Sequence, residues 1–485
     1  MPAGFPCVTH RFVASGPLAR PSPLASGGQL SSFFFPPPPS SLAESPALAK
    51  PRVLTAPLSR RESSRALEEG IAILATVHNP WIEGVPSVSE GKQIVRRGFG
   101  LRKEVAPMLA RDYESSLVEC ARAEGNVLRW PGLELRIAQE FGFCYGVDRA
   151  IDYAYETRKR FPNKRLFLTG EIIHNPSVNQ RLHDIGYRFL DGSHGEEGEW
   201  EDVTEDDILL IPAFGVSIPV LERMRATGAL LVDTTCGSVL NVWRNVERYA
   251  KEGFTCLIHG KWDHEETRAT ASRALVHGGG YLIVRDLEQA ERVAGVIERR
   301  VPAHILTREF VESSSAGFDA GRDLQRIGMA NQTTMLSSES LEIAERMRAA
   351  IGVRYGENAV KERFRAFDTI CSATEDRQAA VLQMLEEAPE VMIIIGGYNS
   401  SNTGHLAEIC SKRIPTYHVK NASELLSAEK IRHQPAFEQE LVESEGWLPA
   451  RPLRIGITAG ASTPDREVGA VIRRLLELRG IDAEL

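Results

Sequence analysis

The chain lacks features that would place it in several common classes of protein. None of its apolar runs reaches the roughly 18 residues that a membrane span needs. No run of lysine and arginine is interleaved with aromatic residues, and the formal net charge is only −8. The sequence therefore predicts neither a membrane partner nor a nucleic-acid partner. It also has no P-loop or GxGxxG motif after a predicted strand, which disfavours nucleotide binding.

Cysteine is scarce and irregularly placed. Seven cysteines are scattered over 485 residues, an odd number without any CxxC pair. This spacing excludes a disulfide framework and a local zinc ribbon, and it predicts a reducing compartment.

Acidic residues are absent before Glu44, in a segment rich in serine and proline. Residues 1–65 are predicted to be disordered because such a segment buries too little apolar surface to offset its ordering entropy. They are expected to be an organelle transit-like leader, a flexible extension or the product of a start codon placed too far upstream. Residues 66–135 are expected to form a helical and mixed N-terminal extension.

Short apolar runs alternate with helical patterns from about residue 136 onward. Such buried strands separated by helices are typical of parallel sheets covered on both faces. The expected strands are 165–170, 207–215, 229–236, 255–260, 281–285, 391–397, 416–420 and 454–460. The predicted fold class is α/β with mostly parallel sheets, in which ligands bind beyond the carboxyl ends of the strands.

Three of the cysteines occupy the same kind of position. Cys144 and Cys236 directly precede helical patterns at 146–160 and 238–253, and Cys371 precedes a capping-box pattern from Ser372 to Glu375. A helix N-terminus lowers the pKa of a thiol and favours the thiolate, which is the form that binds metal. Three such thiols predict one site where three α/β units meet. An iron–sulfur cluster with one open iron and a three-cysteine zinc site both fit.

Polar side chains gather in the other loops that follow strands. Small hydroxyl, amide and imidazole groups at helix starts either cap those helices or bind a phosphate or diphosphate. The candidates are His174, His264, Glu265, Glu266, Gln332, Thr333, Thr334, Ser400, Ser401, Asn402 and Ser462. Asn175 is expected to cap a helix with Pro176 in its first turn.

Eight motifs in this order resemble the 4-hydroxy-3-methylbut-2-enyl diphosphate reductase family, across about residues 136–470. They are "GFCYGVDRA", "GEIIHNPSVN", "VDTTC", "HGKWDHEET", "NQTTML", "DTICSATEDRQ", "GGYNSSNT" and "TAGASTPD". The resemblance implies three α/β units arranged as a trefoil around a central cluster, at 136–236, 237–368 and 369–485. It implies the reductive dehydroxylation of the allylic diphosphate to isopentenyl and dimethylallyl diphosphates, the last step of the methylerythritol phosphate pathway.

The resemblance also implies the roles of individual residues. Cys144, Cys236 and Cys371 match the ligands of one [4Fe–4S] cluster per chain, whose fourth iron binds the substrate hydroxyl. Glu266 matches the acid that delivers protons. The residues that match the substrate-binding pocket are His174, His264, Thr333, Ser400, Ser401, Asn402 and Ser462. Ferredoxin or flavodoxin is the implied electron donor.

Two departures from the family pattern bear on these assignments. Gly237 and Ser238 follow Cys236 where many members have proline, which changes the stiffness of the loop without removing a ligand. "HEET" replaces the "HPE" arrangement, so Glu265 competes with Glu266 as the acid. Both "HEET" and "RRGFG" resemble the longer branch shared by cyanobacteria, plastids and some other bacteria. The expected location is the bacterial cytoplasm, or the plastid stroma if 1–65 is a transit peptide.

Two other functions use the same residues. A zinc hydrolase acting on a phosphorylated substrate would use the three cysteines for the metal and Glu266 as the base. A non-enzymatic iron–sulfur sensor would need a DNA or protein partner, and the missing basic patch disfavours it.

Overall fold

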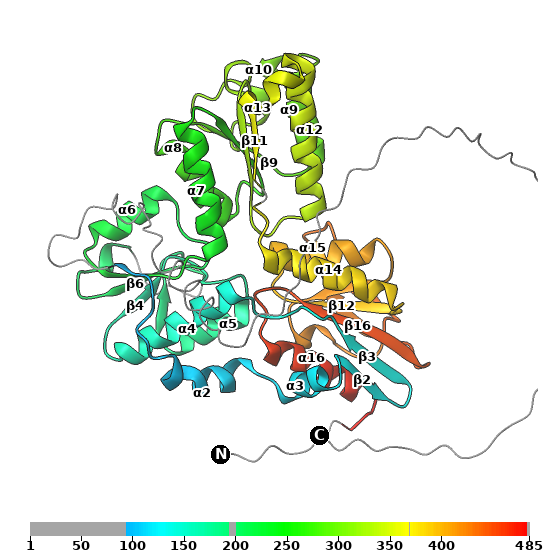
Figure 1. The fold of residues 1–485 in the computed structure, drawn as a ribbon. Helices are drawn as coiled ribbons and strands as arrows, with labels where there is room; N and C mark the ends of the chain where they lie inside the picture. The colour runs from blue at the N-terminus through cyan, green and yellow to red at the C-terminus, as the bar shows by residue number, and fades with distance from the viewer. Residues whose placement is uncertain (1–93, 194–199, 368, 483–485) are drawn as a thin grey trace, which may run out of the picture. The chain divides into compact units, whose positions relative to one another are not determined.

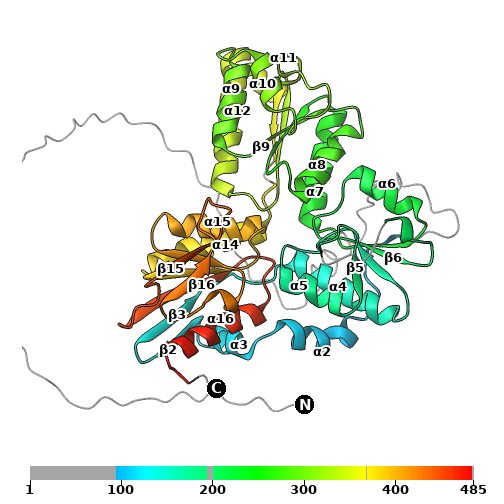
Figure 2. The same cartoon turned by 180° about the vertical axis from the view of Figure 1, so that it is seen from behind.

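The computed structural model describes residues 94–193, 200–367 and 369–482. The leader predicted at 1–65 and the first part of the extension predicted at 66–135 lie outside these residues. The described chain forms three α/β lobes, each built on its own sheet (Figures 1 and 2). Among the described helices, none is both long enough and apolar enough to cross a bilayer.

The first lobe contains a five-stranded, fully parallel sheet in the order β1-β7-β6-β4-β5. Its strands are β1 (Ile94–Val95), β4 (Leu166–Leu168), β5 (Tyr187–Phe189), β6 (Ile208–Ile211) and β7 (Leu230–Asp233). Its helices are α2 (Arg102–Tyr113), α4 (Tyr145–Arg160), α5 (Pro176–Asp184) and α6 (Ile218–Ala226). The short 3-10 turn η1 is Trp200–Asp202. The apolar residues of β6 are all buried, as expected for a sheet covered on both faces.

The second lobe contains a four-stranded parallel sheet in the order β11-β10-β8-β9. Its strands are β8 (Thr255–His259), β9 (Tyr281–Val284), β10 (Ile327–Asn331) and β11 (Phe364–Ala366). Its helices are α7 (Gly237–Lys251), α8 (Glu265–Leu275), α9 (Leu287–Ile297), α10 (Ala303–Glu309), α11 (Ala320–Asp323), α12 (Ser337–Tyr355) and α13 (Glu357–Arg363). Helix α7 packs its apolar stripe onto this sheet through Val242, Val246 and Tyr249.

The third lobe contains a five-stranded sheet in the order β13-β12-β16-β3-β2, parallel except for the β2–β3 hairpin. Its strands are β2 (Val127–Trp130), β3 (Leu133–Ile137), β12 (Val391–Ile395), β13 (Thr416–Val419) and β16 (Leu453–Ala459), with a separate hairpin of β14 (Lys430–His433) and β15 (Val442–Glu445). Its helical segments are α3 (Ser116–Ala123), α14 (Ser372–Glu386), α15 (Ser401–Ser411), η2 (Ala422–Glu424) and α16 (Asp465–Leu478). Helices α14 and α15 cover one face of the sheet, and α3 and α16 cover the other (Figures 1 and 2).

The predicted fold class is confirmed, because all eight expected strands occur and the sheets are mostly parallel. The helices expected after Cys144 and Cys236 are α4 and α7, and Asn175 caps α5 with Pro176 in its first turn, as expected. The residue ranges given for the three units stay a prediction. Strands β2 and β3 lie in the third sheet although they precede the other strands of that sheet by more than 250 residues in sequence, a pairing that the ranges do not include.

Candidate functional site

The three cysteines sit where the chain passes from one lobe to the next. Cys144 follows β3 of the third sheet and begins α4 of the first lobe. Cys236 follows β7 of the first sheet and begins α7 of the second lobe, and Cys371 lies between β11 of the second sheet and α14 of the third lobe. Each is the N-cap residue of its helix. The fold therefore brings together thiols that are far apart in sequence.

The three thiols share one pocket, and its wall at Gly146 shows how close two of them lie. A methyl group added at Gly146 would come within 2.6 Å of the Cys236 Sγ and 3.9 Å of the Cys144 Sγ. The charge of a Cys144 thiolate acts through space on Cys371 and raises the pKa of its thiol. Glycine at this position leaves a cradle between thiols that any larger residue would fill.

Backbone hydrogen bonds hold each cysteine to a neighbouring loop. The Cys144 N–H donates to the Ala461 carbonyl at 3.1 Å, and the Cys371 N–H donates to the Thr333 carbonyl at 3.2 Å. The Cys236 N–H donates to the Ala213 carbonyl at 2.7 Å. The positions of the thiols are thus fixed by the loops that also carry the polar candidates.

At Cys144 and Cys371 the net pKa shift is opposite to the lowering that the helix starts predict. Burial raises the pKa of the Cys371 thiol to about 11, although hydrogen bonds with Thr374 act in the opposite direction. Burial also raises the pKa of Cys144, against a smaller lowering by the N–H of Val147. That expectation is wrong for these two residues because desolvation outweighs the helix terminus. A bound metal cation would supply the positive charge that stabilises the thiolates.

The predicted capping box at Ser372 is also wrong. Helix α14 begins at Ser372, with Cys371 as its N-cap and no side-chain cap hydrogen bond. The carboxylate of Glu375 instead accepts a hydrogen bond from the hydroxyl of Ser337 at 3.2 Å. The Glu375 side chain, which the local pattern assigns to the cap, therefore makes a tertiary contact with α12.

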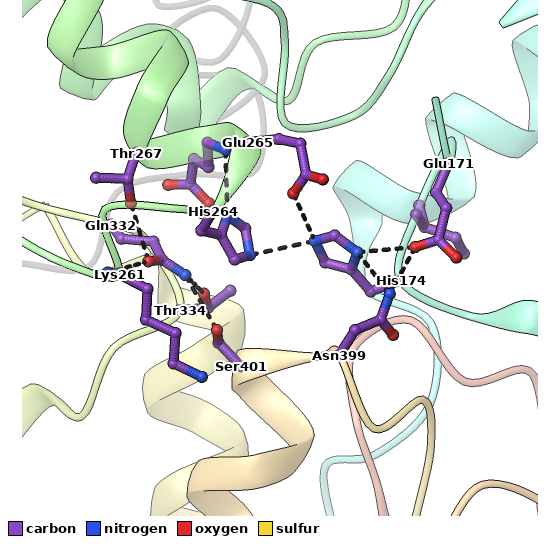
Figure 3. A network of polar contacts seen from close by, with 12 residues as sticks. Glu171, His174, Lys261, His264, Glu265, Thr267, Gln332, Thr334, Asn399 and Ser401 are labelled. Atoms are coloured by element: carbon purple, nitrogen blue, oxygen red, sulfur yellow. Dashed lines mark hydrogen bonds and ion pairs between the residues drawn. The ribbon is translucent and has the colours of Figure 1, made fainter. Parts of the chain in front are cut away.

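Two histidines form the centre of a polar network between the first and second lobes (Figure 3). The Nε2 atoms of His174 and His264 lie 3.1 Å apart, and the His174 Nδ1 lies 3.0 Å from the Glu171 carboxylate. Asn399 donates to the same carboxylate at 2.7 Å. The His174 ring stacks on Phe214, with centroids 4.5 Å apart and planes at 13°. These contacts orient both imidazoles toward the pocket.

Hydrogen bonding assigns the tautomers of this pair. The His264 Nδ1 accepts from the N–H of Glu266 at 3.1 Å, which leaves the proton of a neutral His264 on Nε2. His174 then accepts at Nε2 and donates from Nδ1 to Glu171. Burial, followed by the proximity of His174, lowers the pKa of His264 well below its usual range. His264 is therefore a neutral hydrogen-bond donor.

Glu266 is a buried carboxyl group, only 3% exposed. It accepts hydrogen bonds from the Thr333 N–H at 2.6 Å and from the Thr333 hydroxyl at 3.0 Å. Burial raises the pKa of Glu266 to about 7, although these two bonds act in the opposite direction. Glu265 is instead 52% exposed, with its carboxylate 3.7 Å from the His174 Nε2. The two acids thus differ in their environment: Glu266 is buried and hydrogen-bonded to the pocket loop, whereas Glu265 is exposed.

The remaining candidates come from β10, α15 and the loop after β16. Gln332 accepts from the Lys261 N–H and donates to Ser401 at 3.2 Å, which joins the second lobe to the third (Figure 3). The Asn402 side chain accepts from the Ala461 N–H at 2.9 Å. Ser462 donates to the His174 carbonyl at 3.0 Å. The hydroxyl of Ser400 caps α15.

The eleven residues to which the family resemblance assigns a role all lie along one pocket, whereas the candidates Glu265 and Gln332 are not part of its lining. It is lined by Cys144, Cys236, Cys371, His174, His264, Glu266, Thr333, Ser400, Ser401, Asn402 and Ser462. The structure adds Phe214, Thr374 and Gly146 to the lining, and Glu171 and Asn399 to the network behind His174. Thr374 lies within the motif "DTICSATEDRQ", which is a signal that sequence reasoning could have used.

Two sets of side chains in this region have the chemistry of metal ligands. The three thiols suit a soft metal site such as an iron–sulfur cluster or zinc. His174, His264 and Glu265 present ligand atoms within 4.8 Å of one another, a spacing that suits a divalent cation. The buried acid and the two histidines lie in the same pocket as the thiols, so proton transfer and anion binding are available beside a redox or Lewis-acid centre.

Comparison with known proteins gives a consistent result. A family model described as LytB protein matches residues 135–476. A 4-hydroxy-3-methylbut-2-enyl diphosphate reductase from Gloeobacter violaceus is 44% identical over 398 residues, which cover 81% of this chain and 94% of the relative. The protein of the same name from Thermosynechococcus vestitus is 42% identical over 396 residues, covering 81% and 97%.

Solved structures are similar as well. The E-1-hydroxy-2-methyl-but-2-enyl-4-diphosphate reductase from Plasmodium falciparum has a TM-score of 0.53 at 21% identity, over 72% of this chain and 92% of that chain, and it shows the same fold. A structure of (E)-4-hydroxy-3-methyl-but-2-enyl diphosphate reductase, the terminal enzyme of the non-mevalonate pathway, has a TM-score of 0.45 at 29% identity, over 71% and 99%.

Proposed function

We infer the reaction from one premise: the chain belongs to the LytB protein family, and the relatives that it matches over nearly their whole length are named 4-hydroxy-3-methylbut-2-enyl diphosphate reductases. The chain is therefore a reductase of the non-mevalonate isoprenoid pathway. It converts (E)-4-hydroxy-3-methylbut-2-enyl diphosphate to isopentenyl and dimethylallyl diphosphates. The observation that carries this function is that three thiols, a buried acid and two histidines line one pocket.

Cys144, Cys236 and Cys371 would hold one [4Fe–4S] cluster per chain. Gly146 supports this, since its missing side chain keeps a methyl group away from the Sγ atoms of Cys236 and Cys144. Three thiolate ligands leave one iron of such a cluster without a protein ligand. When bound, the cluster supplies a Lewis acid for the allylic oxygen and the electrons for the reduction.

The diphosphate would be held by groups that lie beside the thiols. His264 and His174 line the pocket as a hydrogen-bonded pair, and Thr333, Ser400 and Asn402 are buried groups with hydrogen-bonding capacity. Ser401 and Ser462 complete the set that matches the family motifs. Fixed dipoles of this kind orient an anion without moving during the reaction, so the allylic end of the substrate stays close to the thiols.

Glu266 would deliver the proton that the leaving hydroxyl needs. Its pKa of about 7 keeps a large fraction protonated at neutral pH, which a general acid requires. Thr333 holds the carboxyl through two hydrogen bonds, so the proton is presented from a fixed position. Glu265, which faces solvent, is less suited to this role.

The reaction balances with two electrons and two protons. The allylic C–O bond breaks, the oxygen leaves as water with one added proton, and a C–H bond forms with the second proton. The electrons come from a one-electron carrier protein, ferredoxin or flavodoxin, which delivers them in two steps.

Metal analysis of anaerobically purified protein tests this function. We expect a brown protein with about four irons per chain that turns over the allylic diphosphate with a chemical reductant. A colourless protein that holds one zinc and hydrolyses a phosphorylated substrate would overturn the proposal, and so would an active protein without iron.

The compartment depends on residues 1–65. The two relatives described above come from cyanobacteria, which favours the bacterial cytoplasm, whereas a transit peptide at 1–65 would place this chain in the plastid stroma. Sequencing the N-terminus of the mature protein from its source distinguishes the two, because a removed leader shifts the first residue past the predicted boundary.

A further inference from the structure

Arg377 is a buried cation that joins the chain segments of two of the three cysteines. It lies in the second turn of α14, the helix that Cys371 begins, and is only 4% exposed. Its guanidinium donates to the Gly142 carbonyl at 2.7 Å, two residues before Cys144, and to the Ala373 carbonyl at 2.7 Å. One side chain thus connects the loop that carries Cys144 to the helix that Cys371 begins.

Within the described residues, this cation has no carboxylate at ion-pair distance. Two carbonyls accept from its terminal nitrogens, while its Nε is buried without a hydrogen-bond partner. Arg377 also acts on Asp148 through space and lowers its pKa, but burial outweighs this effect and the net shift is upward. A buried guanidinium without a close counter-ion is costly, so an anion is expected nearby.

The thiol site supplies that anion. A cluster held by three thiolates carries net negative charge, and the charge of Arg377 already acts on Cys144 in a direction that favours its thiolate. Other arginines near the pocket are less suited to this role. Arg149, for example, is engaged by the carbonyls of Thr234 and Thr235, away from the Cys371 helix.

We propose that Arg377 is a positioning residue for the cluster, one that fixes the Cys144 loop against α14 and raises the reduction potential of the cluster with its buried positive charge. The inference rests on the proposed function, because it requires a cluster at the three cysteines. A positive charge close to the cluster stabilises the reduced form, which carries one more negative charge. Removing the charge therefore makes the cluster harder to reduce.

Two variants separate the charge from the hydrogen bonds. Arg377→Gln removes the charge, whereas Arg377→Lys keeps the charge but loses the planar fork that reaches both carbonyls. Arg413→Gln is the matched control. It removes an arginine that is 49% exposed and pairs with Glu386 at the far end of α14. Iron content and reduction potential are measured for the reconstituted, full-length proteins.

We expect Arg377→Gln to shift the one-electron equilibrium about tenfold toward the oxidised form, which lowers the reduction potential of the cluster by about 59 mV. Arg377→Lys and Arg413→Gln should keep a reduction potential near that of the wild type. Loss of the cluster in Arg377→Gln but not in Arg377→Lys would support the same role. Equal reduction potentials in all four proteins, or equal shifts of the reduction potential in the two Arg377 variants, would overturn it. A wild-type protein that binds no cluster would instead defeat the proposed function, so the two failures are distinguishable.

Discussion

At the scale of single residues, burial separates two adjacent acids that look equivalent in sequence. Glu266 is enclosed and hydrogen-bonded to Thr333, whereas Glu265 is 52% exposed. Since burial raises the pKa of Glu266 to about 7, the group is mostly protonated below that pH and mostly ionised above it. Only the protonated form can donate.

Replacing Glu266 tests this difference. We expect Glu266→Gln to lower turnover by roughly 100-fold to 10,000-fold, the usual contribution of a general acid. The wild-type rate should fall as pH rises above about 7, and the variant should lose that dependence. Turnover of the allylic diphosphate with a chemical reductant, across a pH series, measures both effects. Glu265→Gln is the matched control and should keep most of the activity; a larger loss in that variant would reverse the assignment.

Gly146 gives a second prediction at this scale. In Gly146→Ala the new methyl group would lie 2.6 Å from the Cys236 Sγ, so the thiol must move and the metal site should be lost or loosened. Gly237→Ala is the control, because a methyl group there meets no atom within 4 Å although Gly237 adjoins Cys236. After anaerobic reconstitution we expect about four irons per chain in Gly237→Ala and in the wild type, and far fewer in Gly146→Ala. Full iron content in Gly146→Ala would show that the cradle is not needed.

The sequence was enough to predict residues that line one pocket but not to describe their environment. Residues at strand ends and helix starts converge in any parallel α/β fold, so their pattern predicts a shared pocket. The direction of the pKa shift was predicted wrongly for Cys144 and Cys371 because desolvation depends on tertiary packing, which local position does not reveal. Phe214 and Asn399 were not predicted because stacking on His174 and binding to Glu171 exist only in the folded chain.

At the scale of elements, helix α5 positions His174 through its first turn. Asn175 directly follows His174 and caps the helix by accepting from the N–H groups of Ser177 and Val178. Its amide also donates to Glu467 of α16 at 3.2 Å. The cap therefore connects one substrate-pocket residue to the third lobe.

Removing this cap should destabilise the protein. We expect Asn175→Ala to lower the free energy of unfolding by about 1 kcal/mol, the usual cost of losing an N-cap side chain. Ser217→Ala is the control, since Ser217 is the N-cap of α6 but makes no side-chain cap hydrogen bond. Urea unfolding of the two variants measures the difference. Equal losses in both would mean that the Asn175 side chain does not stabilise α5.

Strands with a continuous apolar sequence were predictable, whereas strands with an interrupted or mixed sequence were not. The run at 391–397 contains β12, whose five residues are all buried. Strand β10 was not predicted because Gly328 interrupts the apolar run in its sequence, "IGMAN". Glycine is required there because a Cβ atom at this position would lie 2.4 Å from the Tyr249 side chain. The β2–β3 hairpin was missed because its mixed composition reflects pairing with a distant strand.

At the scale of the whole molecule, each thiol marks a crossover between two lobes. A cluster bound at Cys144, Cys236 and Cys371 would therefore link all three lobes through one centre. A ligand that binds only the folded state raises the stability of that state. We therefore expect metal binding to stabilise all three lobes together.

Removal of the metal tests this coupling. We expect the metal-free protein to melt at a lower temperature than the loaded protein and to be cleaved faster by protease between the lobes. Cys410→Ala is a control, because Cys410 is fully buried in the third lobe away from the thiol pocket. That variant should lower both melting temperatures while preserving the difference between them. Identical melting of loaded and metal-free protein would contradict the coupling.

The pairing of β3 with β16 also sets the order in which the chain can fold as it is made. Glu134 and Arg454 are register partners in these strands, yet they lie 320 residues apart. At about 5–20 residues per second, β16 leaves the ribosome roughly 16 to 64 s after β3. During that interval the β2–β3 hairpin has no neighbour on its inner edge and must be shielded from aggregation. The third sheet, and with it the pocket, is completed only after β16 has been made.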